Sequence, residues 1–189
     1  MTYKHIFARD FEKNINSIVR VNYAGEMAAV VIYKTQKEIF PNDEHIPQML
    51  ECEMKHFEYF KNLTSELKIE KTIFLPIWKR FAKALAYVSA KNSYFDAMLL
   101  THAVEDVIEK HYAKQIVELG GIVEYYNCED LYIKNNYEIL QKLLAEIKIF
   151  MADEVEHKHT GIENSKMKVV KYTLAKFMTG LAVELSEKY

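Results

Sequence analysis

The chain has 189 residues, a formal net charge of −2 and 50% hydrophobic residues, which excludes a disordered or fibrous protein. It contains only five glycines and three prolines, and tight turns require these residues, so a barrel or sandwich of many short strands is excluded as well. The two cysteines, Cys52 and Cys128, form no CxxC pair. This cysteine usage argues against a disulfide scaffold or a thiolate zinc site and is typical of a reducing compartment.

Hydrophobic residues at steps of three and four predict an all-α fold. The predicted helices cover residues 10–40, a stretch after Pro47, 73–88, 93–119, 131–162 and 167–186. We expect Pro41 to end the first of these helices and the pair Gly120-Gly121 to end the fourth. No linker divides the chain and no run of 18 uncharged apolar residues occurs, so we expect one domain over residues 1–189 without a transmembrane helix.

Four glutamates lie in line with the hydrophobic residues of these helices, whereas most other glutamates are consistent with solvated faces. They are Glu26, Glu53, Glu105 and Glu154, one on each of four predicted helices. Burying an isolated carboxylate is costly, so four buried carboxylates require a common partner. This arrangement predicts a metal centre inside a bundle of four helices.

Two of these glutamates are followed three residues later by a histidine, His56 or His157. Because residues i and i+3 share one side of a helix, each Glu-x-x-His pair can bind one metal ion. With one further glutamate from each of two other helices, this is the ligand set of di-iron and di-manganese carboxylate bundles. Oxygen and imidazole ligands favour iron or manganese over zinc. The alternative, ordinary surface acids on amphipathic helices, does not explain the alternating order of the motifs.

A third Glu-x-x-His pair, Glu156 and His159, overlaps the second, and helical phase distinguishes the two. Glu154 follows Phe150 by four residues, whereas Glu156 is turned away from Phe150 by about 120°. We therefore expect Glu154 and His157 to be ligands, and Glu156 and His159 to face solvent or to lie behind the ligands.

Several segments resemble the motifs of one known family. Residues 20–26, RVNYAGE, are similar to the motif RVDHAGE, and residues 32–36 and 53–56 fit IYxxQ and ExxH. Residues 74–78, FLPIW, are similar to LMPLW, residues 104–116, VEDVIEKHYAKQI, to VEESIxxHYxxQI, and residues 153–161, DEVEHKHTG, to DELEHHDTG. In these segments the chain resembles the demethoxyubiquinone hydroxylases of ubiquinone biosynthesis, which are ferritin-like di-iron proteins. Asn22-Tyr23 departs from the Asp-His of that family, and no glycine occurs at 84–94. Extra residues at 118–136 must form a loop or a helical overhang.

The resemblance implies a ferritin-like four-helix bundle with additional apolar helices that face a membrane. The implied reaction is hydroxylation of the ring of a polyprenyl methoxy-benzoquinone by two iron ions, with O₂ and electrons from NADH or another reductant. The implied metal ligands are Glu26, Glu53, His56, Glu105, Glu154 and His157. The resemblance also implies His111 and Tyr112 as neighbours of the active site. The alternative for these two residues is an aromatic core filler.

Two segments, 71–95 and 164–183, contain nine basic residues, no acid and many large apolar side chains. A polyprenyl substrate resides in a membrane, so we expect these segments to dock on an anionic bilayer surface, with Lys79, Arg80 and Lys83 in the first of them. The alternative is that these faces pack in the core or in a dimer. Nucleic-acid binding is not expected, because the rest of the chain is strongly acidic.

The implied location is peripheral, on the cytoplasmic side of the inner membrane of a bacterium, with a homo-oligomer or other ubiquinone-biosynthesis proteins as possible partners. A rival function is a ferritin- or rubrerythrin-like protein that oxidises or stores iron with the same ligands. That function leaves the basic and aromatic stretch 74–87 and the match at His111-Tyr112 without a role. A third reading is a helical bundle that only binds a partner, and metal content separates it from the other two.

Overall fold

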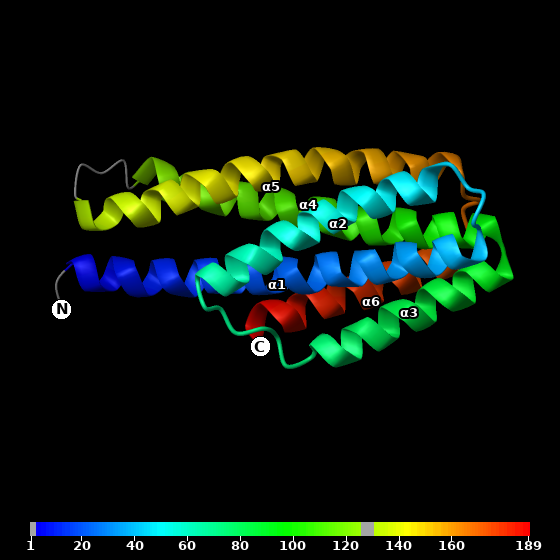
Figure 1. The fold of residues 1–189 in the computed structure, drawn as a ribbon, viewed down its shortest axis with the longest axis horizontal. Coiled ribbons are helices and arrows are strands. Elements are labelled where there is room, and N and C mark those ends of the chain that lie inside the picture. The colour runs from blue at the N-terminus through cyan, green and yellow to red at the C-terminus, as the bar shows by residue number, and fades with distance from the viewer. Residues whose placement is uncertain (1–2, 126–130) are drawn as a thin grey trace.

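A computed structural model describes residues 3–125 and 131–189, and this part of the chain contains six α-helices and no strand (Figure 1). The helices are α1 (Tyr3–Ile39), α2 (His45–Glu66), α3 (Leu75–Asn92), α4 (Tyr94–Tyr125), α5 (Leu131–Glu163) and α6 (Val169–Lys188). Side chains are described for residues 13–124 and 137–189. The all-α prediction is confirmed.

The start of α2 lies two residues before Pro47, where the sequence predicted a later start. Proline is tolerated in the first turn of a helix because the N–H that it lacks has no partner there. The carboxylate of Asp43 accepts hydrogen bonds from the backbone N–H groups of His45, at 3.0 Å, and Ile46, at 2.7 Å. These bonds satisfy donors that the first turn cannot pair internally.

The predicted end of the fourth helix at Gly120-Gly121 is wrong, because α4 continues to Tyr125. Each glycine weakens a helix by about 1 kcal/mol relative to alanine but does not stop it. Leu119, Ile122 and Val123 around the pair contact the hydrophobic cluster that α4 shares with α5, and this burial offsets the loss. The extra residues at 118–136 thus lengthen α4 and α5 where they are described, and residues 126–130 lie outside the described part of the chain.

Four of the helices form two antiparallel pairs, α1 with α2 and α4 with α5, and the pairs face one another (Figure 1). α3 and α6 pack on α1 and α4, whereas α2 contacts α5 on the other side of the bundle. No helix in the described ranges is long and apolar enough to cross a bilayer.

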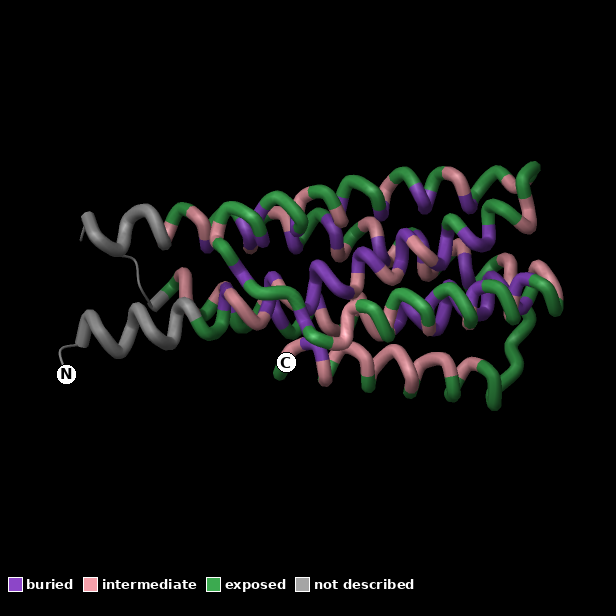
Figure 2. Tube along the Cα trace, turned by 60° about the horizontal axis from the view of Figure 1, so that its bottom comes forward, coloured by how far each residue is buried: buried purple, intermediate pink, exposed green. Residues whose placement is uncertain are grey.

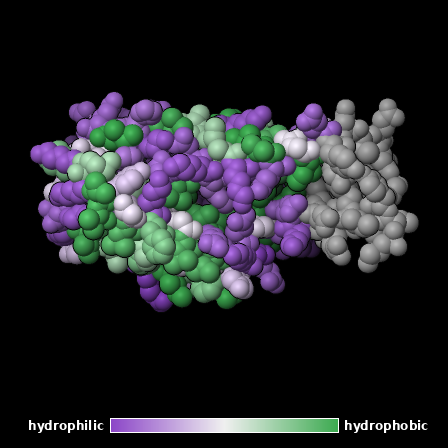
Figure 3. Space-filling model, turned by 180° about the vertical axis from the view of Figure 1, so that it is seen from behind, coloured by the Kyte–Doolittle hydropathy of each residue, from purple (hydrophilic) through white to green (hydrophobic). Residues whose placement is uncertain are grey.

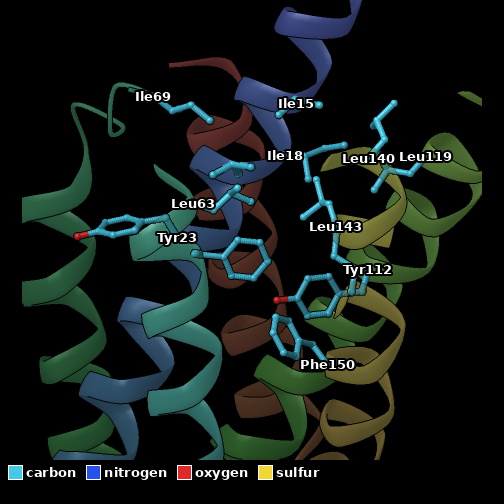
Figure 4. Packing of buried hydrophobic residues seen from close by; sticks show 13 residues of the cluster. Ile15, Ile18, Tyr23, Leu63, Ile69, Tyr112, Leu119, Leu140, Leu143 and Phe150 are labelled. Atoms are coloured by element: carbon cyan, nitrogen blue, oxygen red, sulfur yellow. The ribbon is translucent and has the colours of Figure 1, made fainter. Parts of the chain in front are cut away.

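The buried residues run along the middle of the bundle (Figure 2). One hydrophobic cluster joins α1, α2, α4 and α5 and includes Ile18, Leu63, Tyr112 and Leu143, whose side chains point toward one another (Figure 4). A second cluster includes Tyr33 and several buried alanines and methionines from α1, α2 and α4. The polar residues described below lie on the same helices as these two clusters.

Ion pairs fasten α6 to α4. The ammonium groups of Lys168 and Lys171 each lie 2.7 Å from the carboxylate of Asp96, and Lys176 and Tyr172 bond to Asp106. Three of the four lysines in segment 164–183 are therefore engaged inside the molecule. The side chains of Lys168 and Lys171 nevertheless remain 45% and 53% exposed, and the predicted membrane contact of this segment stays a prediction.

Candidate metal centre

The bundle brings all six predicted ligands to one buried layer. α1 supplies Glu26, α2 supplies Glu53 and His56, α4 supplies Glu105, and α5 supplies Glu154 and His157. Each of the six is at most 6% exposed. They share one layer because each occupies the core-facing stripe of its helix, as the periodicity predicted.

Glu53 and Glu154 lie between the two histidines. The Glu53 carboxylate is 3.7 Å from Nδ1 of His56 and 2.9 Å from Nδ1 of His157. The corresponding distances from the Glu154 carboxylate are 3.3 Å and 3.5 Å. Both carboxylates are thus within reach of either imidazole, which is the position of a bridging ligand between two cations.

Glu26 and Glu105 lie on opposite sides of this central pair. Nδ1 of His56 is 3.5 Å from Glu26, and the ligand atoms of Glu26, Glu53, His56 and Glu154 all lie within 4.8 Å of one another. Glu105 and His157 form the matching group with the same two central carboxylates. The six side chains could therefore hold two cations, each with one outer glutamate and one histidine of its own.

Several polar atoms of this layer have no hydrogen bond with a described residue. The buried atoms that lack a hydrogen bond include Glu26 Oε2, both carboxylate oxygens of Glu53, Glu105 Oε2, Glu154 Oε2 and Nδ1 of both histidines. Buried polar atoms are normally paired, so these atoms require a ligand. Two divalent cations would supply +4 against four carboxylates, and the donor set fits them.

Protonation in this layer is strongly perturbed. Burial and the charges of Glu154 and Glu53 raise the pKa of Glu105 well above its ordinary value. Burial lowers the pKa of His56, but the neighbouring thiol of Cys52 and the nearby carboxylates of Glu154 and Glu26 outweigh burial and raise this pKa overall. Without cations, the cluster therefore holds protons to limit the repulsion among its carboxylates.

Two buried tyrosines bind the outer glutamates. The hydroxyl of Tyr112 on α4 donates to Glu26 on α1, and the hydroxyl of Tyr33 on α1 donates to Glu105 on α4 at 2.5 Å. Burial and the neighbouring carboxylates raise the pKa of both tyrosines well above 10, so both keep their protons. The predicted neighbour Tyr112 thus contacts a ligand directly, and Tyr33 does the same although the sequence indicated it only as a member of the hydrophobic stripe.

His111, the other predicted neighbour, does not contact the ligands through any described hydrogen bond. Its Nε2 lies 2.6 Å from the side-chain amide of Gln115, which also exchanges two hydrogen bonds with Asn22, at 2.8 and 3.0 Å. Asn22, one of the departures from the family motif, is therefore part of a buried amide pair. Burial lowers the pKa of His111 to about 4.

An internal repeat underlies these contacts. Glu26 and Glu105 are each followed by tyrosine seven residues later and by glutamine ten residues later. The repeated residues are Glu26, Tyr33 and Gln36 in α1 and Glu105, Tyr112 and Gln115 in α4. Comparison of the residue spacing around the two glutamates would have revealed this repeat, which the sequence analysis missed.

The outer nitrogens of the histidines have polar neighbours that the sequence analysis also missed. Nε2 of His56 lies 3.0 Å from the carboxylate of Asp153 and 3.5 Å from the thiol of Cys52. The signal for both is positional, because each immediately precedes the glutamate of a Glu-x-x-His motif. Glu156 and His159 are exposed, as helical phase predicted.

An apolar hollow lies beside the centre between α1, α3, α4 and α6. This inner hollow has an interior of about 70 Å³, and it is lined by Gly25 and Val104, which precede the candidate ligands Glu26 and Glu105 in the sequence. A second, outer hollow between α3, α4 and α6 shares Phe81, Leu85 and Met178 with it. The two hollows thus adjoin one another between α3, α4 and α6, and the inner one extends to α1.

Comparison with known proteins identifies similar sequences. Residues 13–186 match the family model described as "Ubiquinone biosynthesis protein COQ7". A relative from Dictyostelium discoideum, named "NADPH-dependent 3-demethoxyubiquinone 3-hydroxylase, mitochondrial", is 37% identical over 79% of this chain and 64% of its own length. The "5-demethoxyubiquinone hydroxylase, mitochondrial" of Saccharomyces cerevisiae is 31% identical over 85% of this chain and 70% of its own length.

A bacterial protein is also similar. The "3-demethoxyubiquinol 3-hydroxylase" of Rhodospirillum rubrum is 29% identical over 79% of this chain and 65% of its own length. The matched regions thus span slightly less than two thirds of the Dictyostelium and Rhodospirillum relatives.

Proposed function

Because the chain belongs to the COQ7 family of ubiquinone biosynthesis proteins, we propose that it hydroxylates the ring of a polyprenyl methoxy-benzoquinone of the demethoxyubiquinone type. The observation that carries this proposal is a buried six-ligand cluster in a bundle whose helices α1 and α4 also line an apolar hollow. The relatives are named as demethoxyubiquinone or demethoxyubiquinol hydroxylases, and these names support a demethoxyquinone as the substrate. In this proposal residues 1–189 form one ferritin-like domain.

The metal centre of this proposal contains two iron ions. Glu26 and His56 would hold one ion, Glu105 and His157 would hold the other, and Glu53 and Glu154 belong to both groups of candidate ligands. When bound, the iron pair supplies the redox chemistry needed to activate O₂ for attack on an aromatic ring. The Dictyostelium relative is named as NADPH-dependent, which supports a reduced nicotinamide, NADPH or NADH, as the source of electrons.

The protein contributes geometry and a dry environment to this reaction. Tyr112 and Tyr33 each hold one outer glutamate in place through a hydroxyl hydrogen bond. The inner hollow is lined by apolar residues such as Ile32, Val104 and Ile108, so a quinone ring bound there would exclude water from this side of α1 and α4. The outer hollow leaves room for the prenyl tail to extend toward the surface.

Membrane contact in this proposal comes mainly from α3. Lys79, Arg80 and Lys83 are exposed, and none forms an ion pair with a described residue. Ile77 on α3 is 53% exposed, and on α6 Phe177 is 64% exposed. Hydrophobic side chains gather along the lower part of the face that α6 and α3 form in Figure 3. A basic and apolar surface of this kind suits peripheral binding to an anionic bilayer.

The last helix does not bury its apolar side chains in the core of this chain. Val170 is 81% exposed and Leu174 is 59% exposed, which leaves them available to a bilayer or to a second protein chain. We propose the bilayer as their partner, because the mouth of the outer hollow opens between α3 and α6.

The proposal is tested by metal analysis followed by turnover. We expect the purified protein to bind two iron ions per chain and to convert a demethoxyquinone into a product that is one oxygen atom heavier, as measured by mass spectrometry. Glu26→Ala and Glu105→Ala should each lose metal and activity. Retention of two metals by both variants would contradict the ligand assignment.

A matched pair of histidine variants serves as the control. His157→Ala should lose one or both metals, whereas His159→Ala, two residues away and exposed, should keep both metals and most activity. Oxidation of Fe²⁺ without any hydroxylated quinone would favour the iron-handling alternative over the hydroxylase.

A further inference from the structure

The two Glu-x-x-His motifs differ in the residue that precedes each of them. This residue is Cys52 in α2 and Asp153 in α5. Both side chains lie behind the histidines, on the side away from the six-ligand cluster, and together with His56 they form a group of three potential donors within 4.8 Å. The sequence position is equivalent in the two motifs, but the chemistry is not.

Asp153 is the hydrogen-bond partner of His56. Its carboxylate accepts a hydrogen bond from Nε2 of His56 at 3.0 Å, which places the ring proton on Nε2 and leaves the lone pair of Nδ1 facing Glu26 and Glu154. A carboxylate behind a histidine fixes the tautomer and the orientation of the ring and raises its basicity as a ligand.

His157 has no such carboxylate. Its contacts with the carboxylates of Glu53 and Glu154 are made by Nδ1, and none is described for its Nε2. The residue in the equivalent place is Cys52, which lines the same hollow as His157, but its described hydrogen bond is to Nε2 of His56, at 3.5 Å, and a thiol is a weak acceptor. This hollow lies between α2 and α5 and encloses about 450 Å³ with its open mouth included, so solvent reaches this side of His157.

The other ligands of the two positions correspond closely. Each position has one outer glutamate bound by one tyrosine, and both share Glu53 and Glu154. The partner of the histidine is therefore the main chemical difference between them. Loss of a partner of this kind typically lowers metal affinity by about 10- to 100-fold.

We propose that Cys52 makes the two metal positions unequal, so that the position of His56 fills first and that of His157 fills second and empties first. This inference rests on the proposed two-metal function. Cys52 acts here as a positioning residue for His157, and Asp153 acts as one for His56.

The test is a titration of the metal-free protein with Fe²⁺ in the absence of O₂, followed by calorimetry. The wild-type protein should bind two ions in two steps whose affinities differ by about 10- to 100-fold. Cys52→Asp should strengthen the weaker step and bring the two together. Asp153→Asn should weaken the stronger step and thereby make the two affinities more similar. The matched control Cys52→Ser should leave the two affinities as different as in the wild-type protein.

Spectroscopy assigns the steps to positions. One equivalent of ⁵⁷Fe should give a single Mössbauer doublet in the wild-type protein and two doublets of equal area in Cys52→Asp. His157→Ala should keep the stronger step, and His56→Ala should lose it. Far-UV circular dichroism of each variant verifies that the helices are intact.

The outcomes distinguish this inference from the function on which it rests. Two ions bound in one step of equal affinity, by the wild-type protein and by Cys52→Asp alike, would overturn the inference and leave the two-metal proposal intact. Two unequal steps that Cys52→Asp does not bring closer would also overturn it. Failure of the wild-type protein to bind any metal would overturn both.

Discussion

At the scale of single residues, Tyr112 and Tyr33 each hold one outer glutamate through a hydroxyl hydrogen bond. In Tyr112→Phe the carboxylate of Glu26 loses its donor, and in Tyr33→Phe that of Glu105 does. We expect each variant to weaken metal binding about 10-fold or more, with the helices intact, as measured by chelator competition and circular dichroism. Tyr59→Phe is the matched control, because Tyr59 packs against Phe60 and Phe150 instead of binding a ligand. Unchanged metal affinity in both variants would contradict this role and would mean that the two tyrosines only pack in the core.

The lowered pKa of His111 leads us to expect that the free energy of unfolding depends on pH. Its pKa is about 4 in the folded protein and ordinarily 6.5, so the unfolded chain binds a proton more readily than the folded one. Above pH 6.5 His111 is neutral in both the folded and the unfolded chain. As the pH falls from 6.5 toward 4, only the unfolded chain takes up the proton, so the free energy of unfolding decreases. The loss is on the order of 3 kcal/mol, or less where solvent screens the charge.

This dependence is measured by urea unfolding of the wild-type protein and His111→Gln at pH values between 7 and 4. The glutamine variant should lose less stability over this range, because it has no imidazole to protonate. The difference between the two proteins isolates His111 from His56, His157 and Glu105, which titrate in both. Parallel curves for the two proteins would show that His111 is not responsible.

At the scale of helices, Gly161 sets the distance between α5 and α4. A Cβ atom at this position would lie 2.7 Å from the backbone nitrogen of His102 and 3.1 Å from the carbonyl oxygen of Met98. Because these are backbone atoms, the helices must move apart to accept it. Gly161→Ala should lower the free energy of unfolding by about 1–3 kcal/mol and weaken metal binding, since His157 lies one turn away on α5.

Gly120 and Gly121 provide the matched control for this substitution. A Cβ atom at either position meets nothing within 4 Å, and α4 is helical through both. Gly120→Ala should therefore raise the free energy of unfolding by about 0.5–1 kcal/mol, as measured by urea unfolding. Destabilisation by this change would mean that α4 is not a continuous helix in solution.

At the scale of the whole molecule, charge separates the face of α3 and α6 from the face of α2 and α5. Each basic residue near an anionic surface contributes about 1 kcal/mol of attraction. Replacing Lys79, Arg80 and Lys83 with Glu should therefore release the protein from anionic liposomes in a sedimentation assay. Turnover of a long-tailed quinone should fall, whereas that of a short-tailed soluble analogue should stay nearly normal.

The same change of charge on the other face is the control for docking. Lys55, Lys142 and Lys148 lie exposed on α2 and α5, and their replacement with Glu should leave liposome binding nearly intact. Binding that survives the change on α3 and does not depend on salt would contradict the docking proposal. The stretch 74–87 would then be part of an interface between protein chains.

The sequence by itself determined the helices and the positions that point into the bundle. A period of 3.6 residues specifies which side chains share a stripe, so Glu26, Glu53, Glu105 and Glu154 could be recognised as buried before any fold was known. It could not specify where a helix ends when packing opposes local propensity, which is why α4 passes through Gly120-Gly121.

Only the tertiary structure decided which side chains meet across helices. The central position of Glu53 and Glu154, the crossed bonds of Tyr33 and Tyr112, and the contact of Asp153 with His56 all join residues on different helices. The pairing of Lys168, Lys171 and Lys176 with Asp96 and Asp106 likewise joins residues that are far apart in the sequence. Periodicity gives the direction of a side chain about its own helix axis, whereas its partner depends on the rotation and offset of the neighbouring helix, which only packing sets.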